Sequence, residues 1–312
     1  MFLNIPHRYE DAMLKGLISP VLTPFNDDLT IATDLYTAMA KRLLSEGGCA
    51  GLAPFGTTGE ALSVGIDERM AALDALIKAG VDPKVMIPGT GLTNLVDTAK
   101  LTRHAVDHGC LGAMILPAFY FKGVSDDGLF SYYSRLIEMV NHPDLRIYLY
   151  HIPQVSGVGL SIDLVRRLHS TFPDVVVGIK DSSGDWENTK ALLDIKGLIT
   201  YPGAELPVIE AVEAGAPGCI SATANLNGQR IAEVIDLCHQ GEWDKAREKH
   251  QLVRGIRLLF QDYAPIPAQK ALLARALGEP RWNNLRPPLM AMPEDKVIAL
   301  ETALKNEFGF SI

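Results

Sequence analysis

The chain has 312 residues, of which 47% are hydrophobic and 21% are charged, a composition typical of a globular protein with a large core. The 29 Lys and Arg residues against 37 Asp and Glu residues give a formal net charge of −8. This acidic balance contains no basic tract, which argues against nucleic acid as a partner. An anionic substrate remains compatible with it, because a local site can be positive in a negative protein.

The cysteines and the apolar runs indicate a cellular location. Four cysteines are spaced too widely for a CxxC motif, which argues against a disulfide framework or a zinc site and favours a reducing cytoplasm. They are Cys49, Cys110, Cys219 and Cys238. Residues 1–8 lack the apolar stretch and cleavage site of a signal peptide, and no apolar run approaches the about 20 residues of a membrane span. We therefore expect a cytoplasmic protein with no membrane partner.

Short apolar segments alternate with longer amphipathic segments along the first 226 residues. The short segments are typical of strands and cover 17–25, 50–55, 84–89, 112–120, 146–152, 175–180, 198–203 and 218–223. The segments between them carry apolar residues at helical spacing, as in the stripe formed by Leu35, Met39 and Leu43. Successive strand–helix units without a hairpin predict a parallel sheet, and this number of strands closes a barrel.

An open doubly wound sheet is the competing arrangement, but it usually carries a glycine-rich dinucleotide-binding motif after its first strand. Here the first strand runs into Leu22, Thr23 and Pro24 instead. After residue 226 only helical segments follow, at 231–240, 242–260, 266–277 and 294–306. We therefore expect an α/β fold: a single (β/α)8 TIM barrel over residues 1–240, with a C-terminal helical extension over 241–312 that packs on it as one structural unit.

Lys180 is the leading candidate for chemistry. It ends an apolar, β-branched run in the segment 177–184, VGIKDSSG, and a long cationic side chain seldom ends a buried strand without a function there. In a barrel, the active site forms at the C-terminal ends of the strands. A lysine kept partly dry at that end can act as a neutral amine and attack a carbonyl, which suggests a Schiff base with a keto acid. The alternative is a surface lysine just past the strand end.

Two other strand ends carry polar groups. The motif GTTGE follows the second strand at 56–60, where backbone N–H groups and the hydroxyls of Thr57 and Thr58 can converge on a carboxylate. A plain turn is the alternative for this motif. The fifth strand ends in YLYHIP at 148–153, and alternation puts Tyr148 and Tyr150 on the same face. A phenol at the barrel mouth can relay protons, although a buried structural tyrosine is the commoner explanation.

Together these motifs resemble the pyruvate-dependent class I aldolases and lyases typified by dihydrodipicolinate synthase and N-acetylneuraminate lyase. The resemblance extends from about residue 16 to residue 278, and its motifs include PVLTPF at 20–25, GTTGE at 56–60, YHIP at 150–153, GIKDSSG at 178–184, GCIS at 218–221 and IPAQK at 266–270. It implies pyruvate, or a pyruvate-like keto acid, and an aldehyde as the small-molecule partners. It also implies a homotetramer built from dimers and a reaction that needs no metal or organic cofactor.

The resemblance assigns roles to the matching positions. Lys180 would form the imine with the keto acid, Tyr150 would relay protons, and Thr57 would hydrogen-bond Tyr150. Thr58 would hold the keto-acid carboxylate through its hydroxyl and backbone N–H. The full set of substrate-binding candidates is Thr58, Gly56, Gly203, Ile220, Tyr120 and Val155.

Two departures from the synthase pattern bear on the substrate. In the synthase, an arginine after the Tyr–x–x–Pro motif binds the second substrate's carboxylate, but here Val155 stands at that position and cannot form a bidentate clamp. Arg135 or Arg167 is a candidate source of a replacement charge. In PAFYF at 117–121, Phe121, with Tyr120 beside it, matches a tyrosine that enters a neighbouring subunit's site. Both changes weaken the case for synthase activity.

Other patterns carry less information. His104 and His108 are four residues apart on a predicted helix, which is half of a possible metal site. No third ligand is evident, so a solvated helix face is favoured. Glu60 is expected to order the Thr57–Thr58 loop. Trp186 is expected to pack at a helix start.

The favoured function is a Schiff-base lyase that cleaves a 2-keto acid reversibly or condenses it from pyruvate. A 2-keto-3-deoxy sugar acid or 4-hydroxy-2-oxoglutarate is the favoured substrate type, and dihydrodipicolinate synthase is the alternative in the same class. An alternative of another class is a keto-acid-binding or regulatory barrel without turnover. A metal-dependent aldolase is a third option, against which the lack of a clear His/Glu cluster counts.

Overall fold

The computed structural model describes residues 12–310. Residues 1–11 and 311–312 lie outside this range. The prediction that residues 1–8 contain no signal peptide, the start of the predicted barrel at residue 1 and the end of the predicted extension at residue 312 therefore fall on residues that are not described. Across residues 12–310, the helices are all too short or too polar to cross a membrane.

Strands and helices alternate from residue 16 to residue 239. Their bounds are β1 (Gly16–Ser19), α1 (Thr33–Ser45), β2 (Cys49–Leu52), α2 (Ile66–Lys78), α3 (Leu95–Asp107), β3 (Ala113–Ile115), α4 (Asp126–Val140), β4 (Ile147–His151), α5 (Pro153–Ser156), α6 (Ile162–Thr171), β5 (Val176–Asp181), α7 (Trp186–Leu193), β6 (Ile199–Pro202), α8 (Val208–Glu213), β7 (Gly218–Ile220) and α9 (Ala224–His239). The chain continues through α10 (Trp243–Gln261), α11 (Pro265–Leu277) and α12 (Glu294–Phe308).

The strands are parallel and form two hydrogen-bonded groups, in the orders β2–β1–β7 and β3–β4–β5–β6. The predicted third strand, 84–89, is not a regular strand. It begins in a 3-10 turn at Pro83–Val85, and Pro88 has no N–H to donate to a ladder. Isolated bridges from Met86 to Leu52 and from Gly89 to Met114 nevertheless join the two groups. The other gap is closed by packing of β6 beside β7.

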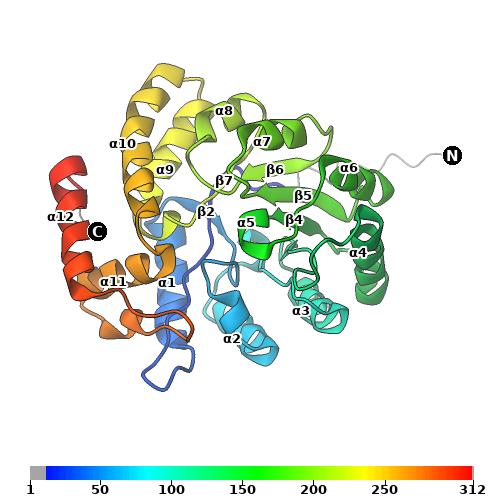
Figure 1. The fold of residues 1–312 in the computed structure, drawn as a ribbon, viewed down its shortest axis with the longest axis horizontal. Coiled ribbons are helices and arrows are strands. Elements are labelled where there is room, and N and C mark those ends of the chain that lie inside the picture. The colour runs from blue at the N-terminus through cyan, green and yellow to red at the C-terminus, as the bar shows by residue number, and fades with distance from the viewer. Residues whose placement is uncertain (1–11, 311–312) are drawn as a thin grey trace.

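The strands enclose one apolar interior. Each strand, or the residue just after it, contributes to this cluster, and so does the bridged segment 86–89. These contributions are Ile18, Ala53, Ile87, Met114, Tyr148, Tyr150, Val177, Ile199, Tyr201 and Ile220. Helices α1–α4 and α6–α9 surround the strands, while α5 lies over the middle of the face turned to the viewer (Figure 1). The fold is therefore the predicted (β/α)8 TIM barrel.

The helices form where apolar stripes coincide with capping residues. In α6, the predicted stripe of Leu164, Val165 and Leu168 is buried, and Ser161 caps the helix by accepting a hydrogen bond from the backbone N–H of Leu164. These side chains pack with the outer face of β4 in a second cluster that includes Leu149. Strand β4 is thus covered on both faces, which is the environment that long apolar runs predict.

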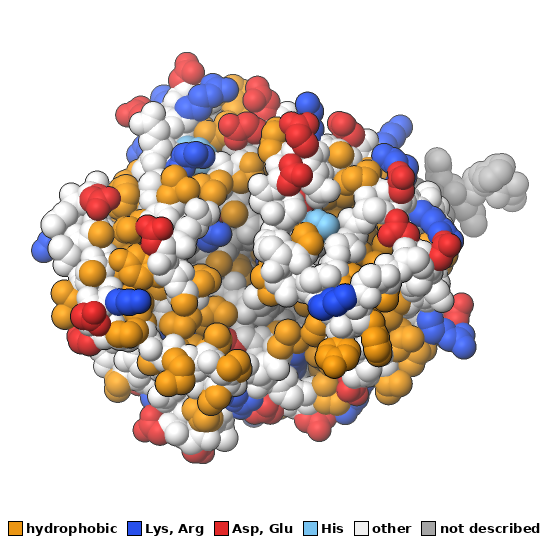
Figure 2. Space-filling view, viewed as in Figure 1, with side chains coloured by type: hydrophobic (Ala, Val, Ile, Leu, Met, Phe, Trp, Pro, Cys, Tyr) orange, Lys and Arg blue, Asp and Glu red, His pale blue; other side chains and the backbone are white. Residues whose placement is uncertain are grey.

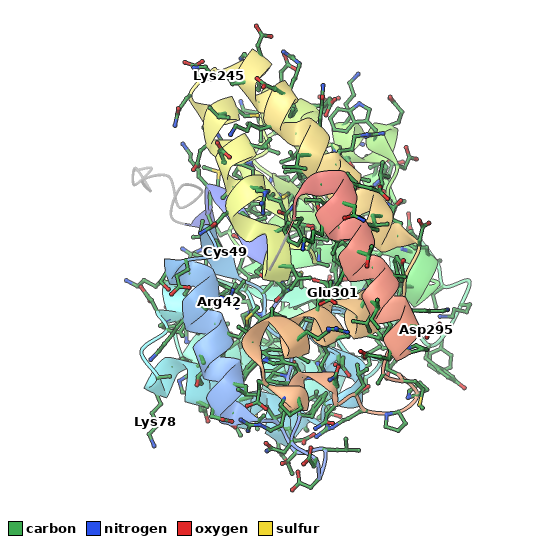
Figure 3. The ribbon with its side chains drawn as sticks, turned by 90° about the vertical axis from the view of Figure 1, so that its left-hand side faces the viewer. Arg42, Cys49, Lys78, Lys245, Asp295 and Glu301 are labelled. Carbon is green, nitrogen blue, oxygen red and sulfur yellow. The ribbon has the colours of Figure 1, made fainter. Side chains whose placement is uncertain are left out.

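The C-terminal helices pack against one another and against the barrel. Ile256 of α10, Leu272 of α11 and Leu300 of α12 share a hydrophobic cluster. The neighbouring Leu273 of α11 instead joins the core shared by α1, α2 and α9. Figure 3 shows α12 lying against α10 and α11. Helix α11 therefore connects the extension to the barrel.

A buried ion pair ties α11 to the loop after β2. Lys270 Nζ lies 2.7 Å from Glu60 Oε1, and both side chains are fully buried. The same ammonium donates to the carbonyl of Thr23 at 2.9 Å. Burial raises the pKa of Glu60 and lowers the pKa of Lys270, while the opposite charge of each partner counteracts the shift. Glu60 thus anchors the loop that carries Thr57 and Thr58.

We predict that Lys270→Met destabilises the fold. The substitution keeps the apolar stem but leaves Glu60 buried without its cation, which should lower the free energy of unfolding by about 3–5 kcal/mol. Lys100→Met is the control, because Lys100 pairs with Asp67 at an exposed position and should cost less than about 1 kcal/mol. Urea unfolding at a fixed protein concentration measures both, and equal effects would contradict a structural role for the buried pair.

Candidate active site

A cavity of about 540 Å³ opens at the C-terminal ends of the strands. The molecule is hollowed near the middle of this face, and charged side chains are concentrated around the periphery (Figure 2). The cavity is lined by residues of β4 and β5, by the loops after β2, β6 and β7, and by α10. This is the end of a barrel at which active sites form, and Lys180 is one of the residues that line the cavity.

Lys180, Tyr150 and Thr57 form a chain of contacts at this end. Lys180 is paired with Tyr150 in the parallel register of β5 and β4, and its Nζ lies 3.4 Å from the Tyr150 hydroxyl. The Tyr150 hydroxyl in turn lies 3.3 Å from the Thr57 hydroxyl. Lys180 is 4% exposed and Tyr150 is 3% exposed. The three residues named as catalytic candidates are thus brought together, and the two central ones are largely shielded from water.

The loop after β2 presents Thr57 and Thr58 in a constrained conformation. Phe55 and Glu60, which flank these residues, have φ angles of 58° and 54°, in the left-handed region that non-glycine residues rarely adopt. Thr58 is buried and lines the Lys180 cavity. Its hydroxyl and backbone N–H donate to no other described residue. Both donors are therefore available to an anion in the cavity.

Gly203 lines the same cavity on the loop after β6. Its backbone N–H donates to the carbonyl of Asp181 at 2.6 Å, which brings the loop close to the end of β5. A side chain is excluded here, because a Cβ would lie 1.9 Å from Ser182 Oγ. Glycine at this position thus allows the cavity wall to approach Lys180 closely.

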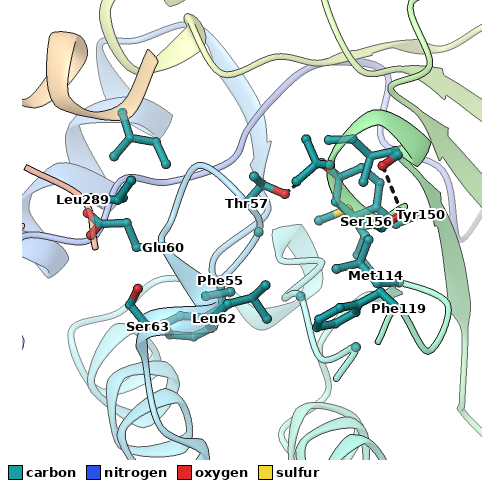
Figure 4. Close-up of a pocket in the computed structure, with 18 of the residues that line it drawn as sticks. Phe55, Thr57, Glu60, Leu62, Ser63, Met114, Phe119, Tyr150, Ser156 and Leu289 are labelled. Carbon is teal, nitrogen blue, oxygen red and sulfur yellow. Dashed lines mark hydrogen bonds between the residues drawn. The ribbon is translucent and has the colours of Figure 1, made fainter. Parts of the chain in front are cut away.

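A second, apolar cavity of about 250 Å³ adjoins Tyr150 and Thr57. Its walls include Gly56 and Val155, so these two substrate-binding candidates border this cavity and not the one that contains Lys180. Figure 4 shows Tyr150 and Phe119 on one side of it, and Leu289 on the other side. Tyr150 and Thr57 line both cavities.

Two further candidates line neither cavity. Ile220 is fully buried in the barrel interior, in the cluster that contains Tyr150. Tyr120 is 73% exposed and makes an edge contact with Phe121, with ring centroids 5.6 Å apart. Val155, although it borders the apolar cavity, is 61% exposed.

The histidines among residues 12–310 lie outside the Lys180 cavity. His151 is buried, burial lowers its pKa, and its Nδ1 accepts a hydrogen bond from the backbone N–H of Leu160. His104 and His108 both place Nε2 against Oδ1 of Asp74, at 2.9 and 3.1 Å. Asp74 lies on α2, so the sequence pattern of α3 did not reveal this third group. The Nε2 atom of each imidazole thus already contacts the Asp74 carboxylate. This cluster lies on α2 and α3, in the outer ring of helices.

The structure also brings in two arginines that the sequence analysis missed. Arg254 and Arg257 of α10 line the cavity that contains Lys180. The arginines named from the sequence do not line it: Arg135 pairs with Glu138, and Arg167 with Asp127, at exposed positions on α4 and α6. The sequence shows the spacing of the α10 arginines, but it does not predict which face of that helix packs against the barrel.

Comparison with known proteins agrees with this geometry. A model of the dihydrodipicolinate synthetase family matches residues 13–307. An uncharacterized DapA-like lyase of Chloroflexus aurantiacus is 34% identical over 293 residues, which cover 94% of this chain and 96% of the relative.

Two solved structures superpose closely on the chain. The dihydrodipicolinate synthase of Agrobacterium tumefaciens is 35% identical with a TM-score of 0.85, covering 93% of this chain and 98% of its own. YagE of Escherichia coli K12, a prophage protein solved in complex with pyruvate, is 26% identical with a TM-score of 0.85, covering 94% and 98%. From its sequence match and its fold together, the chain belongs to the dihydrodipicolinate synthetase family.

Proposed function

We propose that this family member, a Schiff-base-forming lyase, acts on a hydroxylated 2-keto acid and releases or consumes pyruvate. The observation that carries the proposal is the contact of Lys180 Nζ with the Tyr150 hydroxyl at 3.4 Å, inside a cavity that also contains the free donors of Thr58. A 2-keto-3-deoxy sugar acid or 4-hydroxy-2-oxoglutarate is the proposed substrate type.

The proposed reaction begins with recognition of the keto-acid carboxylate by the hydroxyl and N–H of Thr58. The amine of Lys180 attacks C2, and the resulting C2 hydroxyl takes up a proton delivered through Tyr150 and leaves as water, which gives a protonated imine. The C3–C4 bond then breaks as its electron pair moves toward the imine, while the C4 hydroxyl loses its proton and becomes the aldehyde. The enamine takes up a proton at C3, and hydrolysis of the imine frees pyruvate and Lys180.

Tyr150 is the proposed proton relay in these steps. Its hydroxyl lies between the Lys180 amine and the Thr57 hydroxyl, so a proton can pass from one to the other over hydrogen-bond distances. Burial of both Lys180 and Tyr150 restricts competing exchange with water. A barrel that only bound keto acids would need neither an amine at C2 nor a phenol beside it.

The synthase reaction is the second candidate, because the family model and the structural relative carry that name. Val155 counts against it: this residue cannot bind the carboxylate of a second substrate, and it borders the apolar cavity. We also propose a cytoplasmic location, which the four buried free thiols support.

We further propose a homotetramer, as the family resemblance implies. The exposed Tyr120 and Phe121 form an apolar surface of the kind that marks interaction sites. Sedimentation velocity should give the mass of four chains. Phe121→Ser should shift the distribution toward smaller species if this surface lies in an interface, whereas Met290→Ser, at another exposed apolar position, should leave it unchanged.

We predict that pyruvate and borohydride add one reduced pyruvyl group per chain. Peptide mapping should locate this adduct on Lys180, because only an imine is fixed by reduction. Lys180→Ala should abolish both the adduct and turnover, whereas Lys190→Ala, an exposed lysine on α7, should alter neither. Labelling at another lysine would refute the proposed nucleophile, and the absence of any adduct would favour a barrel without turnover.

We predict that Tyr150→Phe reduces kcat by about 10²–10⁴-fold, the range for loss of a positioned proton-transfer group. Pyruvate binding, measured by calorimetry, should be much less affected, since Thr58 is unchanged. Tyr133→Phe is the matched control, because Tyr133 is a buried tyrosine that hydrogen-bonds the carbonyl of Ile115. Nearly full activity of Tyr150→Phe would show that another group handles the protons.

A further inference from the structure

We infer that Arg254 and Arg257 of α10 form a binding subsite for an anionic group at the far end of the substrate. This inference rests on the proposed function and narrows it to 2-keto acids that end in a carboxylate or a phosphate. Both arginines line the cavity that contains Lys180, so one molecule in that cavity has access to the amine and to these guanidinium groups.

One stripe of α10 faces the cavity. Arg254, Arg257 and Gln261 all line it, and their spacing of three and four residues places them on one side of a helix. The adjacent stripe, Ile256 and Phe260, is buried in the core shared with α11 and α12. The apolar side of the helix therefore holds it in place, while three side chains that can donate hydrogen bonds line the cavity.

The charges of the two arginines are not paired by any residue that the structure describes. Neither forms an ion pair or a hydrogen bond with any residue among 12–310, although most of the other arginines in this range do. The Nε of Arg257 is buried and unsatisfied. The guanidinium groups are therefore not committed to a described carboxylate, and an anionic ligand in the cavity that both residues line would form charge-assisted hydrogen bonds with them.

The acidic residues around the cavity are largely committed elsewhere. Asp181 accepts from the Ser183 N–H and from the side chains of Asn188 and Thr189. Glu205, which is fully buried, accepts from two hydroxyl groups of the loop after β7. Glu210 of α8 lines the cavity but pairs with neither arginine. The positive charge of α10 is thus not neutralised by a direct contact.

The two arginines also account for the substitution at Val155. A valine there removes a cation from the α5 side, next to the apolar cavity, whereas α10 supplies two cations at the wall of the adjoining cavity that contains Lys180. The tail of the substrate is therefore expected to point toward α10. An anionic tail is favoured over the neutral hydroxyl end of a simple 2-keto-3-deoxy sugar acid.

Cleavage of three keto acids tests this subsite: 4-hydroxy-2-oxoglutarate, 2-keto-3-deoxygluconate and its 6-phosphate, with pyruvate release as the readout. Wild type should prefer one or both anionic-tailed substrates, and the two arms separate carboxylate from phosphate. Arg257→Gln and Arg254→Gln should each raise KM for the preferred anionic substrate about 10- to 100-fold with little change in kcat. KM for 2-keto-3-deoxygluconate should stay within about twofold.

Arg247→Gln is the matched control, because Arg247 lies on the same helix and faces Asp244 at an exposed position. It should behave as wild type with all three substrates. Preference for the neutral substrate, or equal KM values in the Arg257→Gln, Arg254→Gln and Arg247→Gln variants, would overturn the inference.

Calorimetry in the Lys180→Ala background separates this subsite from the Schiff-base chemistry, because no imine forms there. Adding Arg257→Gln should weaken binding of the anionic substrate about 10- to 100-fold, and an unchanged affinity would overturn the inference. If wild type forms no pyruvyl adduct while this loss of affinity remains, the proposed reaction fails and the anion subsite stands.

Discussion

The parallel register of β4 and β5 is the constraint on which the site depends. It sets Tyr150 opposite Lys180, so a phenol and an amine meet at the end of two neighbouring strands and not at the tips of mobile loops. Because side chains alternate across a strand, a shift of one residue would turn one of them to the outer face. The helices packed outside these strands, through side chains such as Leu149 and Leu164, oppose such a shift.

The site also requires the loop after β2 to bring Thr57 and Thr58 next to Tyr150 and Lys180. Its conformation includes left-handed residues at Phe55 and Glu60, which would be costly in isolation. The buried contact of Glu60 with Lys270 holds it in place from α11. The C-terminal extension therefore acts on the site twice, through α11 beneath the loop and through α10 at the cavity wall. This explains in physical terms why helices that follow the barrel in sequence matter to its chemistry.

Much of this arrangement was predictable from local pattern. Alternating apolar segments predicted the barrel, and the polar residues at the strand ends predicted that Lys180, Tyr150 and Thr57 lie close together, because parallel strands bring their C-terminal ends together. The prediction of a regular strand at 84–89 was wrong, because its apolar residues lie between prolines that prevent a continuous hydrogen-bonded ladder. The positions of Ile220 and Tyr120 depend on depth and loop path, which no local pattern encodes. The position of the α10 arginines at the cavity depends on a contact between distant segments, and the sequence of a helix does not predict which of its faces will pack against a barrel.

The proposed chemistry requires that Lys180 bonds covalently to the keto carbon while Tyr150 and Thr58 hold the rest of the substrate. A crystal structure of the protein soaked with pyruvate tests it most directly. Continuous density is expected between Lys180 Nζ and C2 of pyruvate, with the carboxylate on the donors of Thr58 and the Tyr150 hydroxyl within hydrogen-bond distance of the imine. Pyruvate bound elsewhere, or bound in this cavity beside an unmodified Lys180, would contradict the account.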